Sequence, residues 1–358
     1  MIEINDTRLL KEFKSVTFSG YKRSDVKKHL LTQLFNANLE QSLNWTAELI
    51  CCGAFMELWE IILLFLSKYI HLGNPKIPIY IELRFNNFKH IVTNGYIGNE
   101  LQLRNNNKIR SLFCEVICTL SQSSKRHGFD IIKINKNDDY QLNKLNSRLT
   151  APNTSFASKI FRPDDNKEIF IAINELGYNL SDAKNIVNAC FWIEWIIEYE
   201  SICKLDKRKL ECEYRENIKI DQKFAKDSIW MIWELIFNSC PTELTKKITQ
   251  SLHTLFSLHY SPSCKKKRRF ILYFAVSILI DNYNPSCEII SSATKDIIDK
   301  SAKNIDDIYK QIKKSEKTPK TDYLFNGIEH KTNVEKTFEK LEVLNTINSS
   351  EKKTITFS

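Results

Sequence analysis

Glycine and proline are scarce in this chain, with 8 of each among 358 residues. The many tight turns of a β-sandwich need more of both, so their scarcity favours long helices. Long apolar runs are missing as well. The two most apolar stretches, residues 58–66 and 270–280, are too short to cross a bilayer as a helix. We therefore expect a soluble, mainly α-helical protein without a transmembrane segment.

Familiar catalytic and metal-binding motifs are absent too. The sequence has no GxxxxGK[ST] phosphate-binding loop, no GxGxxG after a strand and no GxSxG turn. Cys114 and Cys118 are helical neighbours, and His253, His259 and Cys264 cluster loosely, but neither group has the paired spacing that closes a zinc site. We therefore expect no metal, no cofactor and no catalytic residues, and we do not favour an enzyme.

The composition is that of a folded protein. Hydrophobic residues make up 42% of the chain and aromatic residues 11%, which excludes wholesale disorder. Many of the 10 cysteines lie inside apolar, helix-like stretches, and no signal peptide is visible. We therefore expect reduced, buried thiols in a cytosol-like compartment.

Two tryptophan-rich segments form the expected centre of the fold. In residues 188–200, two tryptophans share one broad helical face, while Glu194 and Glu198 lie on the opposite face. Residues 228–237 repeat the Trp-x-x-Trp spacing and are apolar nearly all round, which indicates a central, buried helix. The two carboxylates could act as an acid/base pair, but their i,i+4 spacing on a charged face favours solvated side chains.

The remaining pattern is a multi-helix globular core followed by a charged tail. We expect an N-terminal helical half at residues 1–150 and a second helical half, packed on the first, at residues 151–290. Residues 291–358 read as a charged, partly disordered tail with one solvated helix at 295–314. Within the halves, helices are predicted at 25–36, 39–52, 55–70, 79–93, 109–121, 138–148, 168–176, 181–204, 222–239, 242–260 and 266–282, and a short strand at 129–137.

Basic residues gather at two places in a chain whose net charge is +9. One cluster directly precedes the apolar segment 270–280, where cations oppose the helix macrodipole by roughly 0.3 to 1 kcal/mol each. It needs carboxylate partners in a solvated loop or an external anion such as DNA or RNA phosphate. The other cluster is flanked by acidic residues, which favours a solvated face. The candidate nucleic-acid-binding residues are Lys265, Lys266, Lys267, Arg268 and Arg269, with Lys207, Arg208 and Lys209.

A polar stripe is predicted on the expected helix 222–239. Lys223, Asp227, Glu234 and Asn238 lie within about 60° of one another on a helical projection. Such groups must be paired if they are buried. We interpret them as a structural polar network rather than a catalytic one.

Four segments carry a resemblance to a known family. Residues 72–80 (LGNPKIPIY), 172–175 (AINE), 189–198 (ACFWIEWIIE) and 267–269 (KRR) resemble a poorly characterised protein family of nucleocytoplasmic large DNA viruses. The similarity covers roughly residues 20–285 and omits the tail. It implies a viral protein of the infected-cell cytoplasm or virus factory, but no active site to carry over.

A looser similarity concerns the N-terminal helices. Residues 43–48 (LNWTAE), followed by Gly53, Trp59 and residues 73–75, resemble the helical collar of clamp-loader-related ATPases. That similarity implies a packing role in oligomerisation, because the ATPase core is missing. An ordinary helical hairpin explains the same residues.

These observations lead to one favoured function and two alternatives. We expect a non-enzymatic helical scaffold or adaptor of a large DNA virus, in virion assembly or viral DNA metabolism, with viral proteins or self-association as its partners and possible packaging in the virion. The first alternative is an accessory factor that binds DNA or RNA through the basic clusters. The second is a divergent enzyme that uses Glu175, Glu194 or Glu234.

Overall fold

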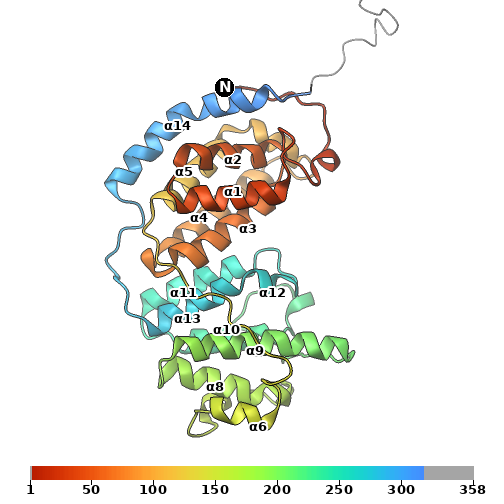
Figure 1. Cartoon of the computed structure of the whole chain (residues 1–358), viewed down its shortest axis with the longest axis vertical. Helices are drawn as coiled ribbons and strands as arrows, with labels where there is room; N and C mark the ends of the chain where they lie inside the picture. Colours follow the sequence, from red (N-terminus) through yellow and green to blue (C-terminus); the bar gives the residue numbers. More distant parts are fainter. Residues whose placement is uncertain (1, 318–358) are drawn as a thin grey trace, which may run out of the picture. The chain divides into compact units, whose positions relative to one another are not determined.

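Helices account for the regular secondary structure of residues 2–317, the part of the chain that the computed structural model describes (Figure 1). Within these residues, β pairing is limited to two isolated bridges, Val16 with Lys22 and Glu211 with Asp227. The predicted mainly α fold is confirmed. The predicted strand at 129–137 is wrong, because these residues run without regular structure and pack apolar side chains on the helices. The rest of the expected tail, from residue 318 onward, lies outside the described residues.

Residues 2–4 and 8–316 belong to one compact unit. Its N-terminal helices are α1 (Arg23–Phe35), α2 (Leu39–Cys51), α3 (Phe55–Phe65), α4 (Ile77–Thr93) and α5 (Asn107–Gln122). After two short helices, α6 (Leu142–Leu145) and α7 (Ser155–Ser158), the longer ones resume. They are α8 (Phe170–Ser181), α9 (Ile186–Leu205), α10 (Ile229–Asn238), α11 (Glu243–Phe256), α12 (Cys264–Lys267), α13 (Arg269–Ile280) and α14 (Ser292–Lys313).

Asparagine and hydroxyl side chains begin several of these helices. The Asn185 side chain accepts the N–H of Asn188 at the start of α9, and Thr242 and Ser291 cap α11 and α14 in the same way. Such caps satisfy backbone donors that have no partner inside the helix. The helix predicted at 181–204 begins later, at Ile186, because Ser181 ends α8 and its hydroxyl donates to the Gly177 carbonyl.

Two aromatic clusters fill the interior. Trp59 of α3 is 1% exposed and packs against phenylalanines of α4 and α5. Trp230 and Trp233 of α10 are fully buried against α11, which confirms the prediction of a central helix there. The helix is shorter than predicted, because residues 222–228 form a 3₁₀ turn, further turns and the isolated bridge at Asp227 before it.

The helix α14 is packed on one face. It runs back across α5 and α2 (Figure 1). Tyr309 and Ile312 are buried, and the Arg110 guanidinium lies 4.0 Å from the centre of the Tyr309 ring. The predicted helix is therefore present, but its apolar face stabilises the core instead of facing solvent.

The connection from α5 to α8 is irregular apart from short helical turns, and polar side chains of α8 and α9 hold it within residues 139–157. Glu175 accepts the backbone N–H groups of Thr150 and Ala151 at 3.0 Å. Asn174 accepts the Ala157 N–H at 3.1 Å, and the Trp195 indole donates to the Asp139 carbonyl at 2.8 Å. These bonds supply the partners that buried backbone groups need where no helix provides them. The predicted helix at 138–148 is reduced to the single turn of α6 and a 3₁₀ turn.

Candidate functional site

The basic cluster at the start of α13 is mostly internal. Lys265 is 2% exposed, and its ammonium contacts the Glu200 carboxylate and lies 2.8 Å from Asp227 Oδ1. The Tyr260 hydroxyl donates to the other oxygen of Asp227 at 2.8 Å. Burial, together with this carboxylate, raises the pKa of Tyr260. Lys265 is thus enclosed by acidic groups rather than offered to solvent.

The two arginines of the cluster point inward as well. Arg268 is 4% exposed, pairs with Glu60 of α3 and donates to the Phe256 carbonyl at 2.6 Å. Arg269 Nη1 lies 2.9 Å from Glu194 Oε2. Because Glu194 is 1% exposed, the prediction of a solvated carboxylate on α9 is wrong for this residue. Its burial raises its pKa despite the neighbouring Arg269.

The exposed members are Lys266 and Lys267 of the first cluster and all three residues of the second. Lys266 pairs with Glu198 at 2.5 Å. Just beyond α9, Arg208 pairs with Glu168 at 2.7 Å and with Asp206 at 3.3 Å. Lys207 and Lys209 are exposed, and Lys209 lies 3.7 Å from Glu211. The acidic partners of Lys265, Arg268 and Arg269 lie in the interior rather than in a solvated loop. Residues 207–209 are all exposed, as their acidic neighbours led us to expect. Nucleic-acid binding stays a prediction for the exposed lysines.

The predicted polar stripe is divided by the structure. Lys223 lies in the turn before α10 and Asn238 at its end, and both are exposed. Asp227 contacts Lys265, while Glu234 accepts from Arg215 Nε at 2.7 Å. The four residues therefore form no single network, because the helix that would align them begins only at Ile229.

Glu234 belongs to a second buried ion-pair cluster. Arg215 is 1% exposed and binds both carboxylate oxygens of Asp165, at 2.9 and 2.7 Å. Burial opposes the charge on Asp165, but hydrogen bonds from Arg215 and two backbone N–H groups outweigh it, so its pKa lies below the usual value. Arg162 also reaches Glu234, at 3.2 Å. The sequence singled out neither Asp165 nor Arg215, which lie in irregular segments without periodicity.

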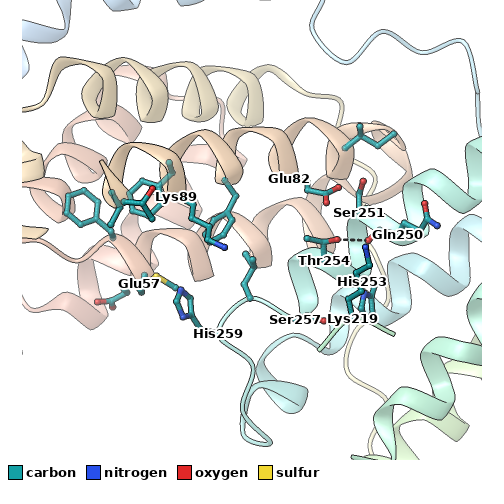
Figure 2. A pocket seen from close by; sticks show the side chains of 18 of the residues that line it. Glu57, Glu82, Lys89, Lys219, Gln250, Ser251, His253, Thr254, Ser257 and His259 are labelled. Carbon is teal, nitrogen blue, oxygen red and sulfur yellow. Dashed lines mark hydrogen bonds between the residues drawn. The ribbon is translucent and has the colours of Figure 1, made fainter. Parts of the chain in front are cut away.

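A large cleft is lined by residues of α3, α4 and α11, and α4 and α11 also pack directly against each other. Its volume is about 1890 Å³, and Figure 2 shows several of the α4 and α11 side chains that line it. The α4 residues that line the cleft are spaced three or four positions apart, so they lie on one face of that helix. The α11 residues that line the cleft also share one face, and they are more polar. The α4 strip is Ile79, Glu82, Phe85, Lys89 and Val92; the α11 strip is Lys246, Lys247, Gln250 and Thr254, followed by Ser257 just after the helix.

The cleft contains one buried histidine. His253 is 7% exposed, and its ring meets the edges of Trp230 and Trp233. Burial lowers its pKa to about 4, so the ring is neutral at pH 7. Its Nε2 lies 3.4 Å from the Ser257 hydroxyl, one turn along the same helix. A neutral histidine beside a hydroxyl resembles a base and nucleophile, but this contact is long and local to the helix, and we interpret it as packing.

The cleft also contains charged groups that the sequence did not single out. Lys89, Lys219 and Lys247 are exposed and make no ion pair with any described residue. They come from α4, from the loop before α10 and from α11. The spacing of α4 placed Lys89 on a helix, but only the fold shows that three separate elements direct lysines into one cleft.

No metal-binding cluster of three or more ligand side chains occurs among residues 2–317. In the same range, no helix combines the length and the apolar character needed to cross a membrane. Comparison of the chain with protein-family models, with curated proteins and with solved structures finds no match. The resemblance to a viral family therefore depends on the sequence segments alone.

Proposed function

We propose that this protein is a helical scaffold or adaptor that binds a segment of a partner protein in the cleft lined by α3, α4 and α11. The observation that carries the proposal is the size of the cleft. Pockets for small molecules have volumes of roughly 300 to 1,000 Å³, whereas this cleft has about 1890 Å³. A polypeptide segment fills such a space better than a metabolite does.

The shape of the cleft supports a helical occupant. The α4 strip runs from Ile79 to Val92, a distance of about 20 Å along the helix axis. A partner helix of about 14 residues has the same length. Accessible apolar side chains are present for its apolar face, since Met56 is 40% exposed and Leu10 is 52% exposed. Recognition of an amphipathic helix in a groove uses this combination of length and apolar contacts.

The biological setting is proposed from the sequence. The resemblance to a family of large DNA viruses supports a role in virion assembly or viral DNA metabolism, in the infected-cell cytoplasm or virus factory. The partners would then be viral proteins or a second copy of this chain. The alternative of an accessory factor for nucleic acid has less support, because Lys265, Arg268 and Arg269 are enclosed by carboxylates.

A peptide array tests the proposal. Peptides of about 14 residues with varied amphipathic patterns are probed with the full chain. We expect a subset to bind, and we expect Met56→Arg to abolish that binding because it places a charge on the apolar lining. The matched control is Leu83→Arg, which changes an exposed leucine of α4 that does not line the cleft. Absence of binding, or binding that Met56→Arg leaves intact, would overturn the proposal.

A further inference from the structure

We infer that the segment bound in the cleft is acidic, an inference that rests on the proposed function. Lys89, Lys219 and Lys247 bring unpaired ammonium groups to the cleft from three different elements. Lys246 adds a fourth, whose nearest carboxylate, that of Glu243, is 4.0 Å away and 94% exposed. Lysines without partners inside the protein interact most favourably with a ligand that supplies carboxylates.

Two of the four carboxylates that line the cleft are already neutralised by the protein itself. Glu57 pairs with Arg23 at 3.0 Å. Glu234 is held between Arg215 and Arg162, at 2.7 and 3.2 Å. Only Glu82 and Glu100 line the cleft without an ion pair to a described residue. Because four lysines line the cleft against these two carboxylates, the electrostatic potential that a ligand meets there is positive.

The lining favours a polypeptide over a nucleic acid. Single-stranded nucleic acid binds through exposed aromatic faces on which bases stack. Phe85 and Phe88 are each 6% exposed, and their rings pack on Trp59 and on each other. Phe237, which is half-buried, packs on Trp233 and His253. The most exposed apolar side chains of the lining are Met56 and Leu10, which suit aliphatic side chains. A helix with one apolar face and carboxylates on its other face matches both the exposed apolar side chains and the lysines of the cleft.

Three helical peptides of about 14 residues test this inference. They share a leucine face and carry Glu, Gln or Lys on the polar face. Fluorescence anisotropy measures their binding to the full chain at about 50 and 500 mM salt. We expect the Glu peptide to bind about tenfold more tightly than the Gln peptide at low salt, because several exposed ion pairs contribute modestly each. High salt should remove most of the difference.

A charge reversal supplies the decisive variant. Lys89→Glu, Lys219→Glu and Lys247→Glu combined should invert the order of the Glu and Lys peptides. The control combines Lys28→Glu, Lys267→Glu and Lys303→Glu, which change the net charge equally at exposed positions outside the cleft. Far-UV circular dichroism confirms the helical fold of both variants.

Each outcome decides the inference. If all three peptides bind equally and Met56→Arg still abolishes binding, the cleft is a docking site but the acidic partner is wrong. If no peptide binds, the proposed function fails with it. If a single-stranded DNA probe binds as tightly as the Glu peptide and loses binding in the cleft variant, the ligand is a nucleic acid and the inference is overturned.

Discussion

Two groups of basic residues in this protein have opposite surroundings. At the start of α13, Lys265 is enclosed by Glu200 and Asp227 and is 2% exposed. In the cleft, Lys89 and Lys247 are exposed and have no carboxylate partner among the described residues. The first group stabilises the fold by satisfying buried acids, whereas the second is available to a ligand.

The difference shows why a dense basic run is a poor guide to a binding surface. The run from Lys265 to Arg269 is the most concentrated positive charge in the sequence, yet its partners lie far away along the chain. Glu60 is 208 residues from Arg268, and Glu194 is brought in by α9. The isolated lysines of the cleft attract no notice in the sequence, although the fold brings them together.

The largest effect is expected when the buried pairing is broken. Lys265→Met leaves Glu200 and Asp227 without their shared cation in the interior. Removing one partner of a buried ion pair costs about 3 kcal/mol or more. Urea unfolding should therefore show a lower midpoint and a lower free energy of unfolding, even though Lys204 and Tyr260 keep their contacts with the two carboxylates.

Lys267→Met is the matched control for this change. Lys267 lies two residues further along and is exposed. We expect its free energy of unfolding to stay within about 0.5 kcal/mol of the wild type. If both variants lost the same free energy of unfolding, burial would not explain the contribution of Lys265 to stability. The contrast between the buried basic cluster and the lysines of the cleft would then fail.

A smaller effect is expected from the histidine beneath the cleft. The pKa of His253 is lowered from 6.5 to about 4 by burial. Between these values the unfolded chain binds a proton that the folded chain does not, so stability is full above pH 6.5 and falls as the pH drops toward 4. At pH 5 the lowered pKa of His253 reduces the free energy of unfolding by about 2 kcal/mol. Buried His71, whose pKa is also lowered to about 4, adds a loss of the same sign.

The variant His253→Phe measures the loss of stability that His253 causes at low pH. The variant should lose less stability than the wild type between pH 7 and 5 in urea titrations at several pH values, by about 2 kcal/mol. Parallel profiles for the wild type and His253→Phe would contradict a buried neutral ring.

The sequence predicts the helices of this protein better than its contacts. Periodicity placed α2, α4 and α5 close to their observed positions and predicted the buried α10 with too early a start, since an apolar face is a local signal. It failed where structure depends on distant partners. Residues 129–148 have strand and helix character, yet they are fixed by contacts such as the bond from the Trp195 indole to Asp139.

The family-like segments have a structural explanation of the same kind. Asn174 and Glu175, in the segment AINE, hold the backbone of residues 150–157. Gly73, in the segment LGNPKIPIY, is needed because a Cβ there would lie 2.3 Å from the Ser124 carbonyl oxygen. These residues anchor irregular segments to helices. Their pattern in the sequence therefore reports packing, and it could not have indicated the cleft.

The smallest effect on stability is expected from the cleft itself. Lys89→Ala, Lys219→Ala and Lys247→Ala remove exposed charges that stabilise no buried acid, so each should change the free energy of unfolding by less than about 0.5 kcal/mol. Removing neighbouring like charges can even raise stability slightly. Urea unfolding of the triple variant checks this expectation. A loss comparable to that of Lys265→Met would mean that these lysines serve the fold, and they would then be unavailable for an acidic partner.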